Sequence, residues 1–140
     1  MKYLLDTCLI SELLKKNPSS NVLHWLDSQD ENSLYLSVLT VGELQKGIAK
    51  LSEDKRKSEL QGWVNNSLCS RFEGRILPID VEVASAWGSL LGDSEKHGKK
   101  LPVMDSLIAS TAEVHNLTVV TRNIRDMQKC QAKVFNPWEP

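Results

Sequence analysis

The sequence lacks a long hydrophobic run, and it lacks an excess of charge of either sign. No apolar stretch reaches the roughly 20 residues that a bilayer-spanning helix needs, and Asp6 interrupts the short apolar segment near the N-terminus. Basic and acidic residues number 17 and 18, which leaves a net charge of −1. The composition therefore predicts a cytoplasmic protein without a membrane anchor. Nucleic-acid binding through bulk charge is excluded, so such binding would need a local basic patch or a metal ion.

Cysteine and histidine are also scarce. The three cysteines, Cys8, Cys69 and Cys130, are widely separated and form no C-x-x-C pair. The three histidines are far apart and lie near no cysteine. This distribution excludes a disulfide framework and argues against a zinc site.

What is present is an ordinary globular composition, arranged as short apolar strands that alternate with helices. The chain has 140 residues, 41% of them hydrophobic, which predicts a single domain over 1–140 with a proper core. Strands are expected at 2–6, 34–38, 75–80, 118–121 and 132–135. Helices are expected at 11–16, from 19 or 20, at 40–51, at 52–67, from 81 and at 103–115, with 92–100 as a polar loop or fraying helix end. The pattern predicts an α/β fold of three layers, in which a parallel sheet of about five strands is flanked by helices.

Carboxylates recur where strands end and helices begin. Asp6 ends the first expected strand, Glu43 lies in the first turn of the helix after the second, Asp105 begins the helix at 103–115, and Asp126 follows the strand at 118–121. In a parallel sheet, ligands bind beyond the carboxyl ends of the strands. Carboxylates gathered there repel one another unless a cation joins them, and Mg²⁺ favours such oxygen ligands.

Each acid also has a purely structural interpretation. Asp6 could cap the helix that follows it, and Thr40-Val41-Gly42-Glu43 fits a capping box. Asp105 could be a helix-start acid favoured by the macrodipole, and Asp126 a solvated loop charge. Four acids at corresponding points of successive strand–helix units are poorly explained by capping alone.

Long stretches of the chain resemble the PIN-domain ribonucleases, and within them the toxins of VapBC-type toxin–antitoxin modules, closest to the FitB-like branch. The matching stretches are YLLDTCLISELLKK, LYLSVLTVGELQKGI, RILPIDVEVASAWGSL, LPVMDSLIASTAEVHNLTVVTRNIRDM and FNPWEP. The resemblance implies a parallel sheet between helices, RNA cleavage with Mg²⁺ or Mn²⁺, a homodimer, and inhibition by a cognate VapB-type antitoxin whose C-terminal segment lies in the toxin groove.

The same resemblance implies roles for individual residues. Asp6, Glu43 and Asp105 would be the principal acids, with Asp126 as the fourth. The supporting residues would be Thr7 and Thr121, by hydrogen bonding to the acids, and Asn123, as a helper or alternative to the fourth acid.

Two positions depart from the family pattern. Cys8 replaces the usual asparagine of a DTN stretch, which puts a helper role in question without removing an acid. Met127 replaces a common phenylalanine, a tolerable apolar exchange. The thiol of Cys8 is expected to be an inert buried group.

The predicted mechanism is metal-assisted hydrolysis of an RNA phosphodiester, with no protein nucleophile. Asp6 and Asp105 would bind the ion most directly, and Glu43 and Asp126 would complete its shell, partly through water. The expected phosphate-binding residues are Lys46, Arg122 and Arg125, whereas Lys99 and Lys100 are better read as solvated charges. Trp25, Trp63 and Trp87 are expected in the core or an interface, and Trp138 is expected to hold the chain end.

Three other functions are compatible with parts of the same sequence pattern. A catalytically silent PIN-fold module that binds RNA or protein would keep the fold without turnover. A haloacid-dehalogenase-type phosphatase needs a second Asp two residues after Asp6, where Cys8 stands. A response-regulator receiver needs an acidic pair after the first strand, which the sequence does not have.

Overall fold

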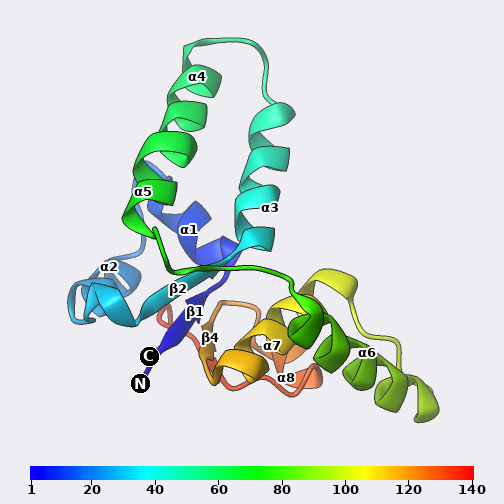
Figure 1. Cartoon of the computed structure of the whole chain (residues 1–140). Coiled ribbons are helices and arrows are strands. Elements are labelled where there is room, and N and C mark those ends of the chain that lie inside the picture. The colour runs from blue at the N-terminus through cyan, green and yellow to red at the C-terminus, as the bar shows by residue number, and fades with distance from the viewer.

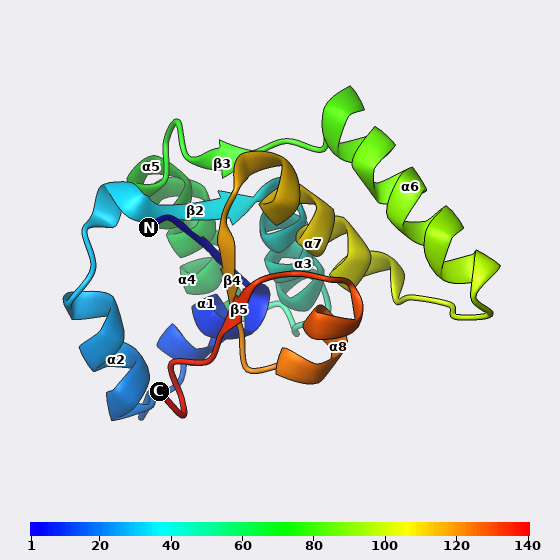
Figure 2. The ribbon, with the colours of Figure 1, turned by 90° about the horizontal axis from the view of Figure 1, so that it is seen from below.

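The computed structural model describes residues 1–140 and contains one sheet of five parallel strands in the order β3-β2-β1-β4-β5 (Figures 1 and 2). The predicted α/β architecture is therefore confirmed. The strands are short: β1 Tyr3–Leu5, β2 Leu34–Ser37, β3 Ile76–Leu77, β4 Thr118–Val120 and β5 Val134–Phe135. In register, Tyr3 of β1 lies opposite Leu34 of β2 on one side and Thr118 of β4 on the other.

Helices cover both faces of the sheet. They are α1 Thr7–Leu13, α2 Ser20–Asp27, α3 Val38–Ala49, α4 Lys55–Gly62, α5 Cys69–Arg71, α6 Val81–Lys96, α7 Val103–His115 and α8 Ile124–Lys129, with a 3-10 turn η1 at Glu31–Ser33 and a π-helical stretch η2 at Trp63–Leu68. Helices α3 and α4 run side by side away from the sheet, while α6, α7 and α8 gather at its other side (Figures 1 and 2).

The alternation of side chains along the strands creates two separate cores. Leu5 and Val120 join a cluster with residues of α1, α2, α3 and η2. Leu4 and Val119, one residue earlier in the same strands, join a cluster with residues of α6, α7 and α8. Because successive residues of a strand point to opposite faces, both faces of β1 and β4 are buried, which explains their uninterrupted apolar sequences.

The strand order places the candidate site. From β1 the chain proceeds to β2 on one side, and it later returns to β4 on the other side of β1. The direction of winding thus reverses between β1 and β4, and the crevice beyond their carboxyl ends is the expected ligand site of such a sheet. Asp6 directly follows β1, and Thr121 directly follows β4.

Two helices near this crevice begin earlier than predicted. The first helix was expected at 11–16 but spans Thr7–Leu13, because Asp6 already caps it. The helix expected at 40–51 begins at Val38 and ends at Ala49, because Ser37 ends β2 and caps α3 at once. In both cases the last strand residue is followed by the helix without a connecting loop, which the sequence pattern did not reveal.

Other boundaries also differ from the predictions. The helical segment expected at 52–67 begins only at Lys55, capped by Asp54, and continues through η2 and α5 to Arg71. The strands expected at 75–80 and 132–135 shorten to two paired residues each. The segment at 92–100, expected as a polar loop or a fraying helix end, is helical as far as Lys96, where α6 ends. Helix α8, which carries Asp126, was not predicted.

Two further expectations agree with the structure. Ser19 caps α2, and its hydroxyl oxygen accepts a hydrogen bond from the backbone N–H of Val22. The helix predicted at 103–115 has those bounds. None of the helices combines the length and apolarity that crossing a bilayer requires.

Candidate active site

Both carboxylate oxygens of Asp6 are held in place. Oδ1 accepts a hydrogen bond from the backbone N–H of Thr7 at 2.9 Å, so Asp6 does cap α1. Oδ2 accepts from the hydroxyl of Thr121 at 2.8 Å, which fixes the carboxylate across the end of the neighbouring strand. Capping is thus only part of the role of Asp6, because the same side chain also lines a cavity.

Glu43 lies in the second turn of α3, not in the first turn as predicted. The cap of this helix is Ser37, whose hydroxyl oxygen accepts from the backbone N–H of Leu39 at 3.0 Å. Thr40 is buried in the first turn of the helix, and its hydroxyl lies 3.2 Å from that of Thr7. The Thr7 hydroxyl donates to Glu43 Oε1 at 2.6 Å. The capping-box interpretation is therefore wrong, and helix capping does not account for Glu43.

Asp105 is the third residue of α7, which starts after Pro102 and has no side-chain cap. Its one side-chain partner is the amide of Asn123, which donates to Oδ2 at a long 3.4 Å. The backbone N–H of Asn123 in turn donates to the Thr121 hydroxyl oxygen at 3.0 Å. Asn123 and Thr121 therefore connect Asp105 to Asp6 through hydrogen bonds.

Asp126 takes a more distant place than the other three acids. It lies in α8, does not line the cavity, and has Lys129 Nζ 4.0 Å from its Oδ1. Its charge still acts on Asp105, whose pKa it helps to raise.

Asp6, Glu43 and Asp105 create an excess of negative charge that the protein does not neutralise. Asp6, Glu43 and Asp105 take part in none of the ion pairs of the structure. Burial raises the pKa of Asp105 above its ordinary value, and the charges of Asp6, Asp126 and Glu43 raise it further. Such mutual repulsion is relieved either by protonation or by a bound cation.

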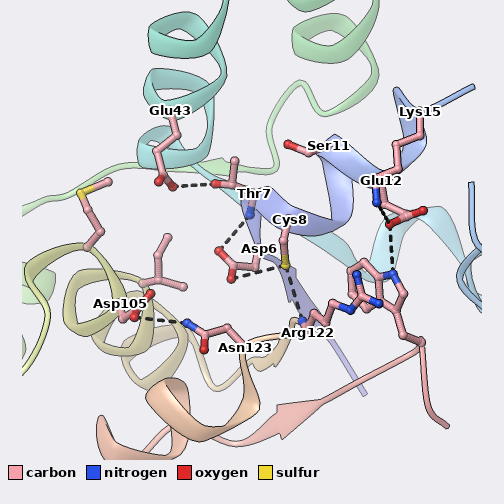
Figure 3. A pocket seen from close by; sticks show the side chains of 13 residues that line it. Asp6, Thr7, Cys8, Ser11, Glu12, Lys15, Glu43, Asp105, Arg122 and Asn123 are labelled. Atoms are coloured by element: carbon pink, nitrogen blue, oxygen red, sulfur yellow. Dashed lines mark hydrogen bonds and ion pairs between the residues drawn. The ribbon is translucent and has the colours of Figure 1, made fainter.

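These acids open onto a cavity of about 500 Å³ (Figure 3). In the close view, Glu43 approaches from α3 and Asp105 from α7, with Asp6 between them and Arg122. The lining residues are Asp6, Thr7, Cys8, Ser11, Glu12, Lys15, Glu43, Met104, Asp105, Ile108, Arg122, Asn123 and Trp138.

The donor set fits a hard divalent ion, although no metal cage is preformed. No three Asp, Glu, His or Cys side chains are close enough together to hold an ion by themselves. Mg²⁺ typically keeps several waters and uses one or two protein carboxylates, so a loose set of oxygen donors suits it. The unpaired charge around Asp105 supplies the electrostatic reason for an ion to bind there.

Cys8 lies beside the acids as a neutral thiol. Its sulfur is 3.8 Å from Asp6 Oδ2 and accepts a hydrogen bond from the backbone N–H of Arg122 at 3.5 Å. Burial, and then the charge of Asp6, raise the pKa of the Cys8 thiol. A thiol that resists ionisation is a poor nucleophile and a poor metal ligand, which agrees with the inert role expected for Cys8.

Of the predicted phosphate-binding residues, only Arg122 lines the cavity. Lys46 and Arg125 are exposed and lie outside its lining. Lys15 lines the cavity and was missed, because a lysine three residues after Glu12 looks like half of an ordinary surface ion pair.

Sequence reasoning also missed Glu12, the most buried carboxylate of the cavity. Its side chain accepts three hydrogen bonds: from Lys15 Nζ at 3.0 Å, from the backbone N–H of Ser19 at 2.9 Å and from Trp138 Nε1 at 3.1 Å. Trp138 does hold the chain end, as expected, but it also lines the cavity. The one available signal was an acidic residue within the apolar stretch of α1, next to the buried Leu9 and Ile10.

Comparisons with known proteins show the family and the fold of the chain. The family model of the PIN domain matches residues 3–131. The chain is 42% identical over 135 residues to Toxin FitB of Neisseria gonorrhoeae, covering 96% of this chain and 97% of that protein. It is 36% identical over 136 residues to VapC ribonuclease Y4jK of Sinorhizobium fredii, covering 97% of both. The solved structure of FitAcB from Neisseria gonorrhoeae superposes with a TM-score of 0.92 at 40% identity, over 99% of each chain.

Proposed function

Since the chain belongs to the PIN domain family, we propose that it is a divalent-metal-dependent endoribonuclease, the toxin of a type II toxin–antitoxin system. The observation that carries the proposal is the cluster of Asp6, Glu43 and Asp105, which line one cavity without a basic partner. The relatives named FitB toxin and VapC ribonuclease support the assignment of both the activity and the biological role.

Mg²⁺ or Mn²⁺ would be held by Asp6 and Asp105, with Glu43 and the more distant Asp126 completing the shell, partly through water. When bound, such an ion lowers the pKa of water and offsets the charge that develops on a phosphodiester. The hydrogen bonds from Thr7 and Thr121 fix the Asp6 carboxylate in advance. Thr7 also fixes Glu43, so two acids are oriented before any ligand arrives.

The groups beside the acids favour hydrolysis by water over attack by a nucleophile of the protein. The Thr7 hydroxyl donates to Glu43 Oε1, and this hydrogen bond orients the Glu43 carboxylate. The raised pKa of Cys8 argues against a thiolate nucleophile. Arg122 lines the cavity with an exposed side chain and is placed to bind phosphate.

The proposal extends to partners and location. We infer that a cognate VapB-type antitoxin inhibits the enzyme, since the chain superposes closely on one chain in each of the solved FitAB and FitAcB structures. A homodimer acting on RNA in the cytoplasm completes the proposal, following the resemblance to the PIN-domain toxins.

The test is cleavage of total RNA by purified, antitoxin-free protein with Mg²⁺, with Mn²⁺ and with EDTA. Cleavage should require the metal and should fall at least about 100-fold in Asp6→Asn and in Asp105→Asn, because each change removes a ligand charge. Asp93→Asn, on the exposed side of α6, is the matched control and should keep full activity.

Equal activity in all variants would identify a contaminant and defeat the proposal. A folded wild-type protein that binds RNA but cuts none of it, with either metal, would instead support the silent PIN-fold module. Mapping the cut ends in an active sample identifies the RNA target.

A further inference from the structure

We propose that Glu12 and Trp138 are positioning residues that hold Arg122 at one end of the cavity, where its guanidinium binds an RNA phosphate adjacent to the one that is cut. This inference rests on the proposed ribonuclease function. It assigns roles to two cavity residues, Glu12 and Trp138, that metal binding and catalysis leave unexplained.

Arg122 is the free cation of the cavity. Its guanidinium carbon lies 5.4 Å from the centre of the Trp138 ring, a cation–π arrangement. The guanidinium forms no ion pair and donates no hydrogen bond within the protein. Its N–H groups are therefore available for the bidentate contact that arginine makes with phosphate.

Lys15, the other cation of the cavity, is not free in this way. Its Nζ lies 3.0 Å from Glu12 Oε1, so its charge is already paired. Arg122 is thus the one basic side chain in the lining whose charge remains to be matched by a ligand.

Trp138 is held in place by packing and hydrogen bonds, although only two residues follow it in the chain. Its side chain belongs to the same buried cluster as Leu5 and Leu9, and the residue is 8% exposed. Its backbone N–H donates to Asn136 Oδ1, and its carbonyl accepts from Asn21 Nδ2, each at 2.9 Å. The ring that supports Arg122 therefore has little freedom to move.

Glu12 fixes the polar edge of that ring. The residue is 4% exposed, and its Oε1 accepts from Trp138 Nε1 at 3.1 Å. All three donors around Glu12 come from the protein itself, including Lys15 and the backbone of Ser19. A carboxylate whose acceptor positions are filled in this way does not need an external ion. In this respect Glu12 differs from Asp6, Glu43 and Asp105.

The arrangement in space explains why the contacted phosphate is a neighbouring one. Figure 3 shows Glu12, Lys15 and Arg122 on the opposite side of Asp6 from Glu43 and Asp105. With the phosphate to be cut placed at the acids, an RNA strand that runs along the cavity across Asp6 would bring an adjacent phosphate to Arg122. Arg122 would then contribute to binding before and during the reaction alike.

The experiment is a double-mutant cycle on Arg122 and Trp138. The substrate is a fluorescein-labelled single-stranded oligoribonucleotide that contains the cut site mapped from total RNA. Arg122→Ala should raise KM about tenfold or more with kcat within about twofold, since the lost contact is uniform binding. Trp138→Leu should raise KM about threefold, and the double variant should match Arg122→Ala within about twofold, because Trp138 acts through Arg122.

Binding is measured as well, in an Asp105→Asn background by fluorescence anisotropy, so that the cycle does not depend on turnover. There, Glu12→Gln should weaken binding about twofold to threefold, because the amide cannot accept from all three donors. Simple charge repulsion predicts the opposite sign, since this change removes a negative charge from the cavity.

Two variants control for loss of folding, which circular dichroism melts would reveal. Trp138→Phe keeps an aromatic face under Arg122 and should stay within about twofold of wild type even if Trp138→Leu does not fold. Trp87→Phe is the matched control, since it also deletes an indole N–H donor, in this case to Ser106 Oγ on α7. It should leave KM unchanged.

Additive effects of Arg122→Ala and Trp138→Leu, or an Arg122→Ala protein with wild-type KM and affinity, would overturn the inference while leaving the nuclease intact. Tighter RNA binding by Glu12→Gln would overturn it too. Loss of metal-dependent cleavage in the wild type is a different result and counts against the proposed function.

Discussion

Glu12 and Asp105 are carboxylates of the same cavity, but their surroundings shift their pKa values in opposite directions. Hydrogen bonds from Lys15 and then from the Ser19 backbone lower the pKa of Glu12 to about 2. Burial and three neighbouring acids raise the pKa of Asp105, which has only the long contact with Asn123 to offset them.

The difference separates a carboxylate that supports the structure from one that awaits a ligand. A buried charge whose acceptor positions are filled by protein donors stabilises the fold and gains nothing from a metal ion. A charge surrounded by like charges carries a repulsion that only a proton or an external cation removes. Burial does not explain the difference, because Glu12 is the more buried of the two residues and yet has the lowered pKa, whereas the partners of each residue do explain it.

The largest expected effect is on the free energy of unfolding in metal-free buffer. Glu12→Ala should lower it by about 2–4 kcal/mol, because the buried N–H groups of Ser19 and Trp138 lose their acceptor. Asp105→Asn should raise stability instead, because it removes a repelling charge. Urea unfolding in EDTA measures both. Destabilisation by Asp105→Asn would remove the contrast between the two residues.

A smaller effect is expected from added Mg²⁺. An ion that binds only the folded protein stabilises it by about 1.4 kcal/mol at ten times its Kd. The resulting rise in Tm should be equal in wild type and Glu12→Gln, and should be lost or strongly reduced in Asp105→Asn. Thermal melts across a Mg²⁺ titration provide the measurement, and a reduced rise in Glu12→Gln would mean that Glu12 is itself a ligand.

The smallest effect is the pH dependence, since each residue titrates a single group. The folded pKa of Glu12 lies below its ordinary value of 4.5, so its stabilisation is full above that pH and disappears as the pH falls toward about 2. The pKa of Asp105 in the folded protein lies above its ordinary value of 3.8. The protonated form of Asp105 therefore stabilises the fold fully below that pH, and this stabilisation disappears as the pH rises through the raised pKa.

Melting curves in EDTA from acid to neutral pH test these signs. The Tm deficit of Glu12→Gln relative to wild type should shrink as the pH is lowered. The Tm advantage of Asp105→Asn should grow as the pH is raised, by no more than a few degrees. If the Tm difference from wild type changed in the same direction with pH in both variants, that result would contradict the assignment of opposite pKa shifts.

Much of the fold and part of the site could be predicted from local sequence. The apolar strands at Tyr3–Leu5 and Thr118–Val120 and the helix at Val103–His115 are strongly patterned, and the structure places them as expected. Asp6 and Asp105 could be placed because each stands at a strand end or helix start. Glu43 was assigned to the right helix but to the wrong turn, since the capping role of Ser37 competes with that of Thr40 in the sequence.

The missed features depend on contacts between residues far apart in the chain. Glu12 and Trp138 are separated by 126 positions, so neither reveals the other by spacing. Lys46 and Arg125 looked as suitable for phosphate as Arg122, because all three are basic residues close in sequence to an acid. Only the folded chain shows that Arg122 alone of these lines the cavity, over the Trp138 ring.

The sequence by itself determined the parallel sheet, the two buried faces of its central strands and the placing of acids after those strands, because side-chain periodicity and chain order are local properties. The tertiary structure decided which acids remain unpaired and which one is satisfied. That outcome depends on the strand order, which sets β4 beside β1, and on the return of the chain end to α1. Charge and hydrogen-bond balance at a site are sums over neighbours in space, and a linear pattern does not contain them.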